Sequence, residues 1–382
     1  MSMKTNWRVT LPLLALLAGA VTGRAHAEDK PSVIRLAFPG VGVGNRPVNG
    51  NSALATAHLK GLFEEEFKKD GIKITWSHLR GAGPAMNELY ANRLVDFSTL
   101  GDLPSVIGRS SGLRYRLLAA STVRSNIYVS VPADSPVESV AQLKGKRIAV
   151  NKGTATHLAG LKILEKHGLT DKDVKLINMD TNAAQLALAT RDIDAALGGQ
   201  DYLRLRDQGI ARVVFTTRGG PPEVTSNSSF LGNEDFITKY PEITKRVLKV
   251  YVQASKYVSE TTPTQLYQLW AKSGTTFSSY REDLQSEDFK NRYSPLIDPY
   301  IHARYALQIG EAKRLGLIRA PFEFTQFIEP KFLQAALKEL NLESYWLPRG
   351  PDGKFTKSVQ GGASVQQEGQ AATRVAQASP PN

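Results

Sequence analysis

The chain has 382 residues and contains no cysteine. This absence excludes disulfide bonds, a thiol nucleophile, thiolate metal ligands and a lipid-modified N-terminal cysteine. Histidine is scarce, with six residues, and none forms an H-E-x-x-H pattern or another metal-binding spacing. We therefore expect no metal, no cofactor and no catalytic activity. An enzyme built on the same fold is the less favoured alternative.

Long hydrophobic runs are also missing, apart from Leu11 to Ala20 near the start, which is too short to span a membrane. Lys4 and Arg8 precede this run, and Ala25-His26-Ala27 follows it as a small-x-small cleavage site. The pattern predicts a cleaved signal peptide at residues 1–27. We expect a soluble periplasmic protein without a lipid anchor.

Acidic residues are outnumbered, with 48 Lys and Arg against 36 Asp and Glu, so the formal net charge is +12. The basic residues are scattered, and no arginine-rich run or RNA-binding aromatic motif is present, so we expect no nucleic-acid partner. An anionic ligand would suit the charge, although solubility alone could also explain it. The length and the hydrophobic fraction of 41% suffice for two lobes.

A strand, a glycine-bearing turn and a helix follow one another between Lys144 and Leu169. The strand is Arg147 to Val150, and Thr154 is a plausible N-cap for the helix. The first turn of such a helix presents free backbone N–H groups, to which Thr154 and Thr156 add hydroxyls. Two interpretations stay open: an anion-binding site, or ordinary capping of one connection.

This unit recurs, which favours the functional interpretation. An earlier strand, Ile34 to Phe38, precedes a glycine-rich loop and a helix predicted at residues 52–69. Residues 91–96 (ANRLVD) parallel residues 189–194 (ATRDID), and each segment leads to a further acid, Asp102 and Asp201 respectively. The sequence thus predicts two doubly wound α/β lobes with a hinge and a central cleft, into which several helix N-termini point.

The remaining segments complete the predicted organisation. We place the hinge at Arg124-Ser125 and expect a tyrosine-rich cap at residues 280–305 and further C-terminal helices. The glycine-rich loop at 39–47 matches a dinucleotide fingerprint only loosely, so small-ligand contacts by its polar residues are favoured. The predicted domains are lobe I at residues 28–123 and 231–348, lobe II at residues 124–230, and a disordered tail at residues 349–382.

The order and spacing of several motifs resemble a known family. The motifs are Gly81-Ala82-Gly83-Pro84, Leu100-Gly101-Asp102, Val140 to Val150, Lys152 to His157, and Ile193-Asp194-Ala195-Ala196. They resemble the periplasmic substrate-binding proteins of ABC importers, in the sulfonate-, taurine- and nitrate-binding (NMT1/THI5-like) branch. The resemblance implies a periplasmic binding protein of type II, which closes on a small organic anion and delivers it to an inner-membrane permease. We expect a monomer.

The resemblance also implies where the ligand binds. It transfers contacts to Ala82, Gly83, Leu100, Gly101, Asp102, Thr154, Ala155, Thr156 and His157. Their neighbours and the early loop complete the predicted ligand-binding set with Asn45, Arg46, Gly81, Lys152, Gln200 and Asp201. Leu100 stands where the family often has threonine, and Gly199-Gln200-Asp201 stands where it often has Trp-Asp-Pro. These departures predict a larger or more polar sulfonate, or a different organic anion.

Two alternatives remain beside the sulfonate receptor and the less favoured enzyme. Nitrate or another small molecule could be the ligand of the same cleft. A ligand-sensing partner of a periplasmic signalling receptor would have the same sequence features as a transport receptor. The exact ligand and the function of the tyrosine-rich segment and of the tail do not follow from the sequence.

Overall fold

The computed structural model describes Met1 and residues 30–355, so the predicted signal peptide and most of the predicted tail lie outside the described residues. Between Pro31 and Phe355 the chain forms two five-stranded sheets. Their strand orders are β2-β1-β3-β10-β4 and β7-β6-β8-β5-β9. The two orders are equivalent position by position, as a repeat of the same unit requires.

In each sheet three parallel strands are followed by an inserted antiparallel strand and a last strand beyond it. The first sheet contains β1 (Val33–Phe38), β2 (Lys73–His78), β3 (Phe97–Gly101), β4 (Tyr115–Ala120) and β10 (Ser228–Asn233). The second contains β5 (Tyr128–Pro132), β6 (Arg147–Val150), β7 (Lys175–Asn178), β8 (Ala195–Gly198) and β9 (Ala211–Thr216). The inserted strands β10 and β5 are where the chain passes from one sheet to the other.

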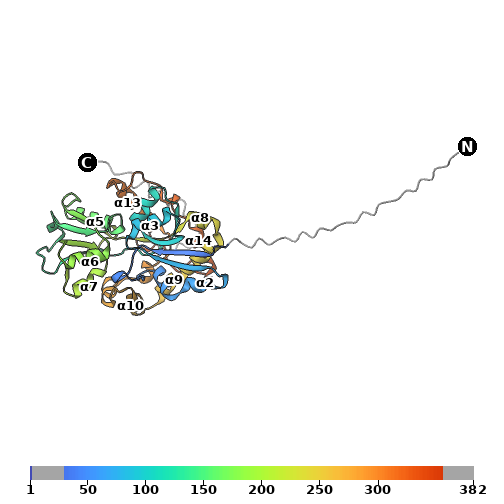
Figure 1. The fold of residues 1–382 in the computed structure, drawn as a ribbon, viewed down its shortest axis with the longest axis horizontal. Helices are drawn as coiled ribbons and strands as arrows, with labels where there is room; N and C mark the ends of the chain where they lie inside the picture. The colour runs from blue at the N-terminus through green and yellow to red at the C-terminus, as the bar shows by residue number, and fades with distance from the viewer. Residues whose placement is uncertain (2–29, 356–382) are drawn as a thin grey trace. The chain divides into compact units, whose positions relative to one another are not determined.

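Helices cover the sheets, and Figure 1 shows the green helices α5, α6 and α7 grouped apart from α2, α3, α8, α9 and α14. The early helices are α1 (Ala53–Lys60), α2 (Leu62–Phe67), α3 (Ala82–Ala91), α4 (Asp102–Ser110), α5 (Ala155–Lys166), α6 (Thr181–Ala189) and α7 (Asp201–Asp207). The later ones are α8 (Glu234–Lys239), α9 (Pro241–Glu260), α10 (Pro263–Trp270), α11 (Phe277–Asp283), α12 (Phe289–Arg292), α13 (Pro299–Arg314) and α14 (Lys331–Glu339). Short 3₁₀ segments lie at Val43–Asn45, Lys68–Asp70, Val140–Leu143, Pro222–Val224, Ala271–Ser273 and Phe324–Gln326.

The predicted internal repeat is present as the same set of contacts in both sheets. The Arg35 backbone N–H and Nε donate to the Asp96 carboxylate at 2.8 and 3.0 Å, and the Asp96 N–H donates back to the Arg35 carbonyl. Arg147 and Asp194 repeat the arrangement at 2.7 and 3.3 Å. Each pair joins the first strand of a parallel set, β1 or β6, to the turn before the third strand of that set, β3 or β8.

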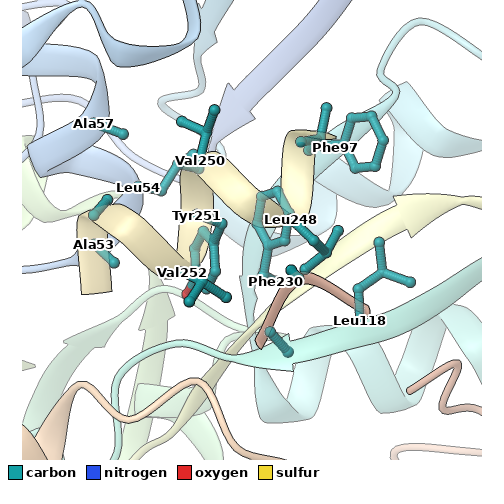
Figure 2. Close-up of a cluster of buried hydrophobic side chains, with 14 of the residues drawn as sticks. Ala53, Leu54, Ala57, Phe97, Leu118, Phe230, Leu248, Val250, Tyr251 and Val252 are labelled. Carbon is teal, nitrogen blue, oxygen red and sulfur yellow. The ribbon is translucent and has the colours of Figure 1, made fainter. Parts of the chain in front are cut away.

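Helix α9 supplies the core on one face of the first sheet. Its residues Leu248, Val250, Tyr251 and Val252 are fully buried against α1 and the sheet. Figure 2 shows Tyr251 beside Phe230 of β10, and the two rings stack with centroids 4.3 Å apart. The Tyr251 hydroxyl donates to the Ala120 carbonyl at 3.0 Å, which satisfies its one polar group in this apolar setting. Helix α9, which begins at Pro241, is one of the C-terminal helices that the sequence predicts.

Three expectations about individual segments differ from the structure. The helix predicted at residues 52–69 is divided at Gly61, whose left-handed φ of 66° ends α1 and starts α2. The tyrosine-rich segment 280–305 is not an external cap, because its tyrosines are buried and form core clusters with α10 and α4. The chain is still packed at Arg349, which is 2% exposed and donates through Nε to Asp298 at 2.7 Å.

The lobe boundaries remain predictions. The chain returns to the first sheet at β10, which begins at Ser228. Residues 28 and 29 and residues 356–382 lie outside the described part of the chain. Among the described residues, no helix combines the length and the hydrophobicity that a membrane crossing needs.

The repeated ion pair generates a stability prediction. Asp96 is 1% exposed and accepts several hydrogen bonds from Arg35, so Asp96→Asn should lower the free energy of unfolding by about 2 kcal/mol. Asp194→Asn is the matched control, because the equivalent side chain is 31% exposed and water replaces its lost bonds. Urea unfolding of both variants is the measurement, and equal losses would contradict the asymmetry expected from burial.

Candidate ligand-binding site

The two segments that pass between the sheets meet at one point. The Ser125 N–H donates to the Ser226 carbonyl at 2.8 Å, and the Ser226 N–H donates back at 3.1 Å. Beside this bridge, Arg124 adopts a left-handed φ of 57° and its N–H donates to Asn227 Oδ1. The bridge lies at the predicted hinge position and joins the first crossing to the second.

A cavity of about 280 Å³ opens at this bridge. It lies between the carboxyl ends of the parallel strands of both sheets, where doubly wound folds bind ligands. None of the described residues that line it carries a charged side chain. The lining consists of Pro39, Ala82, Gly83, Leu100, Gly101, Pro104, Ser125, Asn151, Thr154, Ala155, Thr156, Met179, Thr181, Ala184, Leu197, Gly198, Gly199, Ser226, Asn227 and Ser228.

Four helices begin at the wall of this cavity. Ala82 and Thr181 are the first residues of α3 and α6, Gly101 precedes α4, and Thr154 is the N-cap of α5. The first turn of each helix has backbone N–H groups without partners inside the helix, and the helix dipole places partial positive charge there. The cavity therefore favours a negatively charged group, although its lining within residues 30–355 includes no cationic side chain.

Neutral side chains add further hydrogen-bond donors. Among the described residues that line the cavity, Ser125, Asn151, Thr156, Thr181 and Ser226 make no side-chain hydrogen bond to the protein. Thr154 differs, because its hydroxyl donates to the Asn151 carbonyl at 2.6 Å and accepts the His157 N–H at 3.4 Å. Thr156 thus has its hydroxyl available to a ligand, whereas the Thr154 hydroxyl forms the turn.

Close backbone contacts shape the cavity wall. A Cβ on Gly83 would lie 2.4 Å from the Pro104 Cβ, and one on Gly101 would lie 3.1 Å from the Ala155 Cβ. Glycine therefore lets α3 approach α4, and lets the first sheet approach the start of α5. Ala82 adopts a left-handed φ of 50°, which costs an alanine roughly 1–2 kcal/mol. Such strain at a cavity wall is typical of a functional site.

A second cavity of about 210 Å³ shares Pro39, Ala82, Asn151 and Thr181 with the first. Unlike the first, it contains charged residues. Arg80 and Asp180 form an ion pair at 3.3 Å, and Asn182 Nδ2 donates to Asn45 Oδ1 at 3.2 Å. Each of these contacts links a loop of the first sheet to α6 or its N-cap, on the side of the second sheet.

Of the predicted ligand residues, the structure brings seven to the first cavity: Ala82, Gly83, Leu100, Gly101, Thr154, Ala155 and Thr156. Ala82 and Asp201 line the second. Gly81 precedes the lining residue Ala82, and Gln200 precedes the lining residue Asp201, but neither Gly81 nor Gln200 lines a cavity. Lys152, Asn45 and Arg46 are exposed and line neither cavity, although Asn45 contacts the lining residue Asn182.

Asp102 lies behind the cavity wall rather than on it. It is 1% exposed, and its carboxylate accepts from Asn227 at 3.2 Å and from Gln308 Nε2 at 2.8 Å. Burial raises the pKa of Asp102, and the charge of Arg304 opposes this effect. The equivalent acid Asp201 accepts a hydrogen bond from Thr275, and desolvation raises its pKa as well. Both carboxylates thus accept hydrogen bonds that link neighbouring segments of the chain.

His157 is buried in the first turn of α5, and its Nδ1 accepts the Gly153 N–H at 3.3 Å. Burial lowers the pKa of His157, and nearby Lys152 lowers it further. The imidazole is therefore neutral near pH 7. It supports the turn at residues 151–154 from behind, while Asn151 and Thr154 face the cavity.

Part of the cavity lining lies outside the residues predicted from sequence. Thr181 follows β7 in the second half of the repeat, just as Ala82 follows β2 in the first half. The internal repeat, extended to this position, would therefore have identified Thr181. Asn151 lies in the predicted glycine-bearing turn but is not among the predicted ligand residues. Ser125, Ser226 and Asn227 reach the cavity through the contact between the two crossing segments, which no local pattern predicts.

Residues 52–264, more than half of the chain, match the model of the NMT1/THI5-like family. The chain belongs to the NMT1/THI5-like family. A relative from Bacillus subtilis, named a putative aliphatic sulfonates-binding protein, is 28% identical over 261 residues, which cover 68% of this chain and 75% of that protein. The motifs that suggested the family from sequence lie within the matched residues.

Solved structures agree with this membership. A putative periplasmic sulfonate-binding protein, SsuA, from Methylobacillus flagellatus KT has a TM-score of 0.68 and 29% identity, covering 83% of this chain and 97% of its own. The desulfurization enzyme DSZB has a TM-score of 0.60 at 20% identity and covers 80% of this chain and 99% of its own. The NMT1/THI5-like fold therefore occurs in binding proteins and in an enzyme.

Two features bear on enzymatic chemistry in this NMT1/THI5-like chain. Gly108-Arg109-Ser110-Ser111-Gly112 matches the G-x-S-x-G pattern, but it lies at the end of α4 rather than in a strand–turn–helix elbow. The Ser110 hydroxyl donates to the Ala320 carbonyl at 2.7 Å, so it packs against another loop. Among the described residues, no group of three or more His, Asp or Glu is arranged to hold a metal ion.

The close contact between α3 and α4 gives a test of the cavity wall. Gly83→Ala places a Cβ against Pro104, so we expect a loss of about 1–3 kcal/mol in stability and at least about tenfold weaker ligand binding. The matched control is Gly310→Ala in α13, where the added methyl group meets no atom within 4 Å. That variant should gain up to about 1 kcal/mol in urea unfolding because alanine favours the helix. A Gly83→Ala protein of unchanged stability would contradict the wall geometry.

The neutral His157 predicts a pH effect. Because the native pKa is lowered, the unfolded chain binds a proton that the native state does not, and stability falls as pH drops through about 6.5. Protonation also removes the acceptor of the Gly153 N–H. In urea unfolding between about pH 7 and about pH 5, His157→Gln should show a shallower decline than the wild type. Identical pH slopes would refute the assignment.

Proposed function

We propose that this chain is the solute-binding receptor of an ABC importer, and that it holds a small organic sulfonate in the first cavity. The observation that carries the proposal is the neutral, donor-rich wall: four helix N-termini and five side chains that make no hydrogen bond to the protein. Relatives named as sulfonate-binding proteins support the same ligand class.

The chemistry of a sulfonate suits such a wall. Its single negative charge is spread over three acceptor oxygens, and it stays ionised throughout the physiological pH range. Each oxygen can accept hydrogen bonds from backbone N–H groups and hydroxyls, and charge-assisted bonds of this kind are stronger than neutral ones. A buried anion is stable only when its desolvation is offset by such donors.

The second cavity provides room for the rest of the ligand. Each cavity alone is smaller than the roughly 300–1,000 Å³ of pockets for drug-sized ligands, so the ligand is small. Leu100 adds no hydroxyl at the sulfonate end, whereas Arg80, Asp180 and Asp201 surround the other end. We therefore favour a sulfonate whose organic part carries a polar group.

Delivery to an inner-membrane permease follows from the same proposal. The contacts Arg80–Asp180 and Asn45–Asn182 join the two sides of the cleft and would form and break as the halves close and open. Closure around the ligand would present the permease with a surface that only the loaded receptor has. Periplasmic location, a monomeric state and the absence of catalysis are parts of this proposal.

An enzyme is the second candidate, because the fold also occurs in a desulfurization enzyme. The chain has no cysteine, and its G-x-S-x-G match lies outside the cavity lining. None of the described residues that line the first cavity offers a charged group as a base. We therefore propose binding without chemistry. Incubation of the protein with a bound sulfonate, followed by mass spectrometry, should return the ligand unchanged.

The first experiment is a thermal-shift and calorimetric comparison of alkyl and aryl sulfonates, taurine, nitrate and carboxylates. A sulfonate at about a hundred times its dissociation constant should stabilise the protein by about 2.7 kcal/mol. Thr156→Val keeps the shape but removes the hydroxyl, so it should weaken sulfonate binding about tenfold, or about 1.4 kcal/mol.

Thr264→Val is the matched control, because Thr264 is exposed at the start of α10 and lines neither cavity. It should bind like the wild type. Stabilisation by nitrate or a carboxylate, with no response to any sulfonate, would reject the ligand class. Wild-type affinity in Thr156→Val would reject the proposed hydroxyl contact.

A further inference from the structure

Helices α5 and α13 are linked beyond the first turn of α5, which lines the ligand cavity. Leu158 of α5 belongs to the same buried cluster as Ile301 and Tyr305 of α13. Further along both helices, Arg314 donates two hydrogen bonds to Glu165, each at 2.9 Å. These two contacts define the face of α5 that lies against α13.

Lys162 lies on that face, four residues after Leu158 and three before Glu165. It is only 9% exposed. Its Nζ donates to the main-chain carbonyl of Glu223 at 3.3 Å, and no carboxylate of the described residues forms an ion pair with it. The Lys162 ammonium group therefore has N–H donors left over, and no carboxylate of the described residues is paired with its charge.

Arg304 of α13 is a second buried cation, at 5% exposure. Among the described residues its guanidinium has no ion pair, and its Nε and Nη2 are shielded from solvent without a hydrogen-bond partner. Tyr300 and Gln308 lie one turn before and after it, and the Tyr300 hydroxyl and Gln308 Oε1 are likewise shielded without partners. One stripe of α13 thus carries three successive polar side chains with unsatisfied atoms.

The two cations act on each other. Burial lowers the pKa of Lys162, and the charge of Arg304 is the next cause of this shift. Asp102 is the buried acid nearby, but its carboxylate already accepts from Asn227 and Gln308. Glu311 pairs with Arg314, and Glu223 is exposed. Two positive charges therefore face at most one buried negative charge.

Buried charges without partners strongly destabilise a folded protein, and anions are the ligands that compensate cations. We propose that Arg304, Lys162 and the Tyr300 hydroxyl bind a small monovalent inorganic anion of the size of chloride. Arg304 and Lys162 offer donors only, and the Tyr300 hydroxyl can donate as well, which is the chemistry that a halide requires. One negative charge makes the region neutral when Asp102 is ionised.

This site is separate from the proposed sulfonate site, since neither Lys162 nor Arg304 lines either cavity. The two regions communicate through Asp102, which accepts from Gln308 on one side and from the cavity residue Asn227 on the other. Helix α5 follows a strand of the second sheet, whereas α13 packs on α4, which follows a strand of the first. An anion between them would therefore hold the two halves together.

The test measures melting temperature in sodium chloride and sodium bromide against sodium gluconate at constant ionic strength. We expect a saturable rise of at least about 2 °C for the wild type in either halide. Arg304→Gln should lose this response, while Arg281→Gln, at an exposed arginine outside the region, should keep it. Thr156→Val should also keep it, so failure of the sulfonate proposal is distinguishable from failure of this one.

A crystal of the wild-type protein grown in sodium bromide provides a second measurement that does not depend on the variants folding. We expect an anomalous peak within hydrogen-bonding distance of the Arg304 guanidinium and the Lys162 Nζ. Water in that position, with no anomalous signal, would overturn the proposal. An equal halide response in Arg304→Gln and the wild type would overturn it as well.

Discussion

The exchange of one strand between the two sheets is the constraint on which this structure depends. Each half supplies three parallel strands, and the strand inserted beside the third one arrives from the other half: β5 in the second sheet and β10 in the first. The two crossing segments must therefore run next to each other, and they bond at Ser125 and Ser226. Because of this exchange, the carboxyl ends of both parallel sets face a common cavity.

The electrostatic character of the cavity follows from that geometry. Helices that begin after parallel strands direct their N-terminal N–H groups at the space beyond the sheet edge. Four such helices around one cavity supply positive potential without cationic side chains. Asp102 begins α4 but lies behind the wall, where it accepts hydrogen bonds from Asn227 and Gln308. Its charge is therefore used to fix the wall and not to repel an anion.

Local sequence patterns predicted the repeated units well. The strand–turn–helix at residues 147–166 and the parallel motifs ending in Asp96 and Asp194 have the predicted structure. Prediction was weaker where long-range packing decides. The tyrosine-rich segment at residues 280–305 suggested a cap, yet its tyrosines fill the core around α10 and α4. Arg349 suggested the start of a tail, yet Asp298 binds it in a buried position.

The sequence by itself determined the two α/β repeats, the helix starts with their capping residues, and seven of the residues along the first cavity. These features depend on periodicity, turn chemistry and caps, which act over a few neighbouring residues. Only the tertiary structure decided that Ser226 and Thr181 also line the cavity, that Asp102 lies behind its wall, and that Lys162 is buried near the charge of Arg304. Such contacts join residues far apart in the chain, and their burial and partners are set by how the helices pack on the sheets.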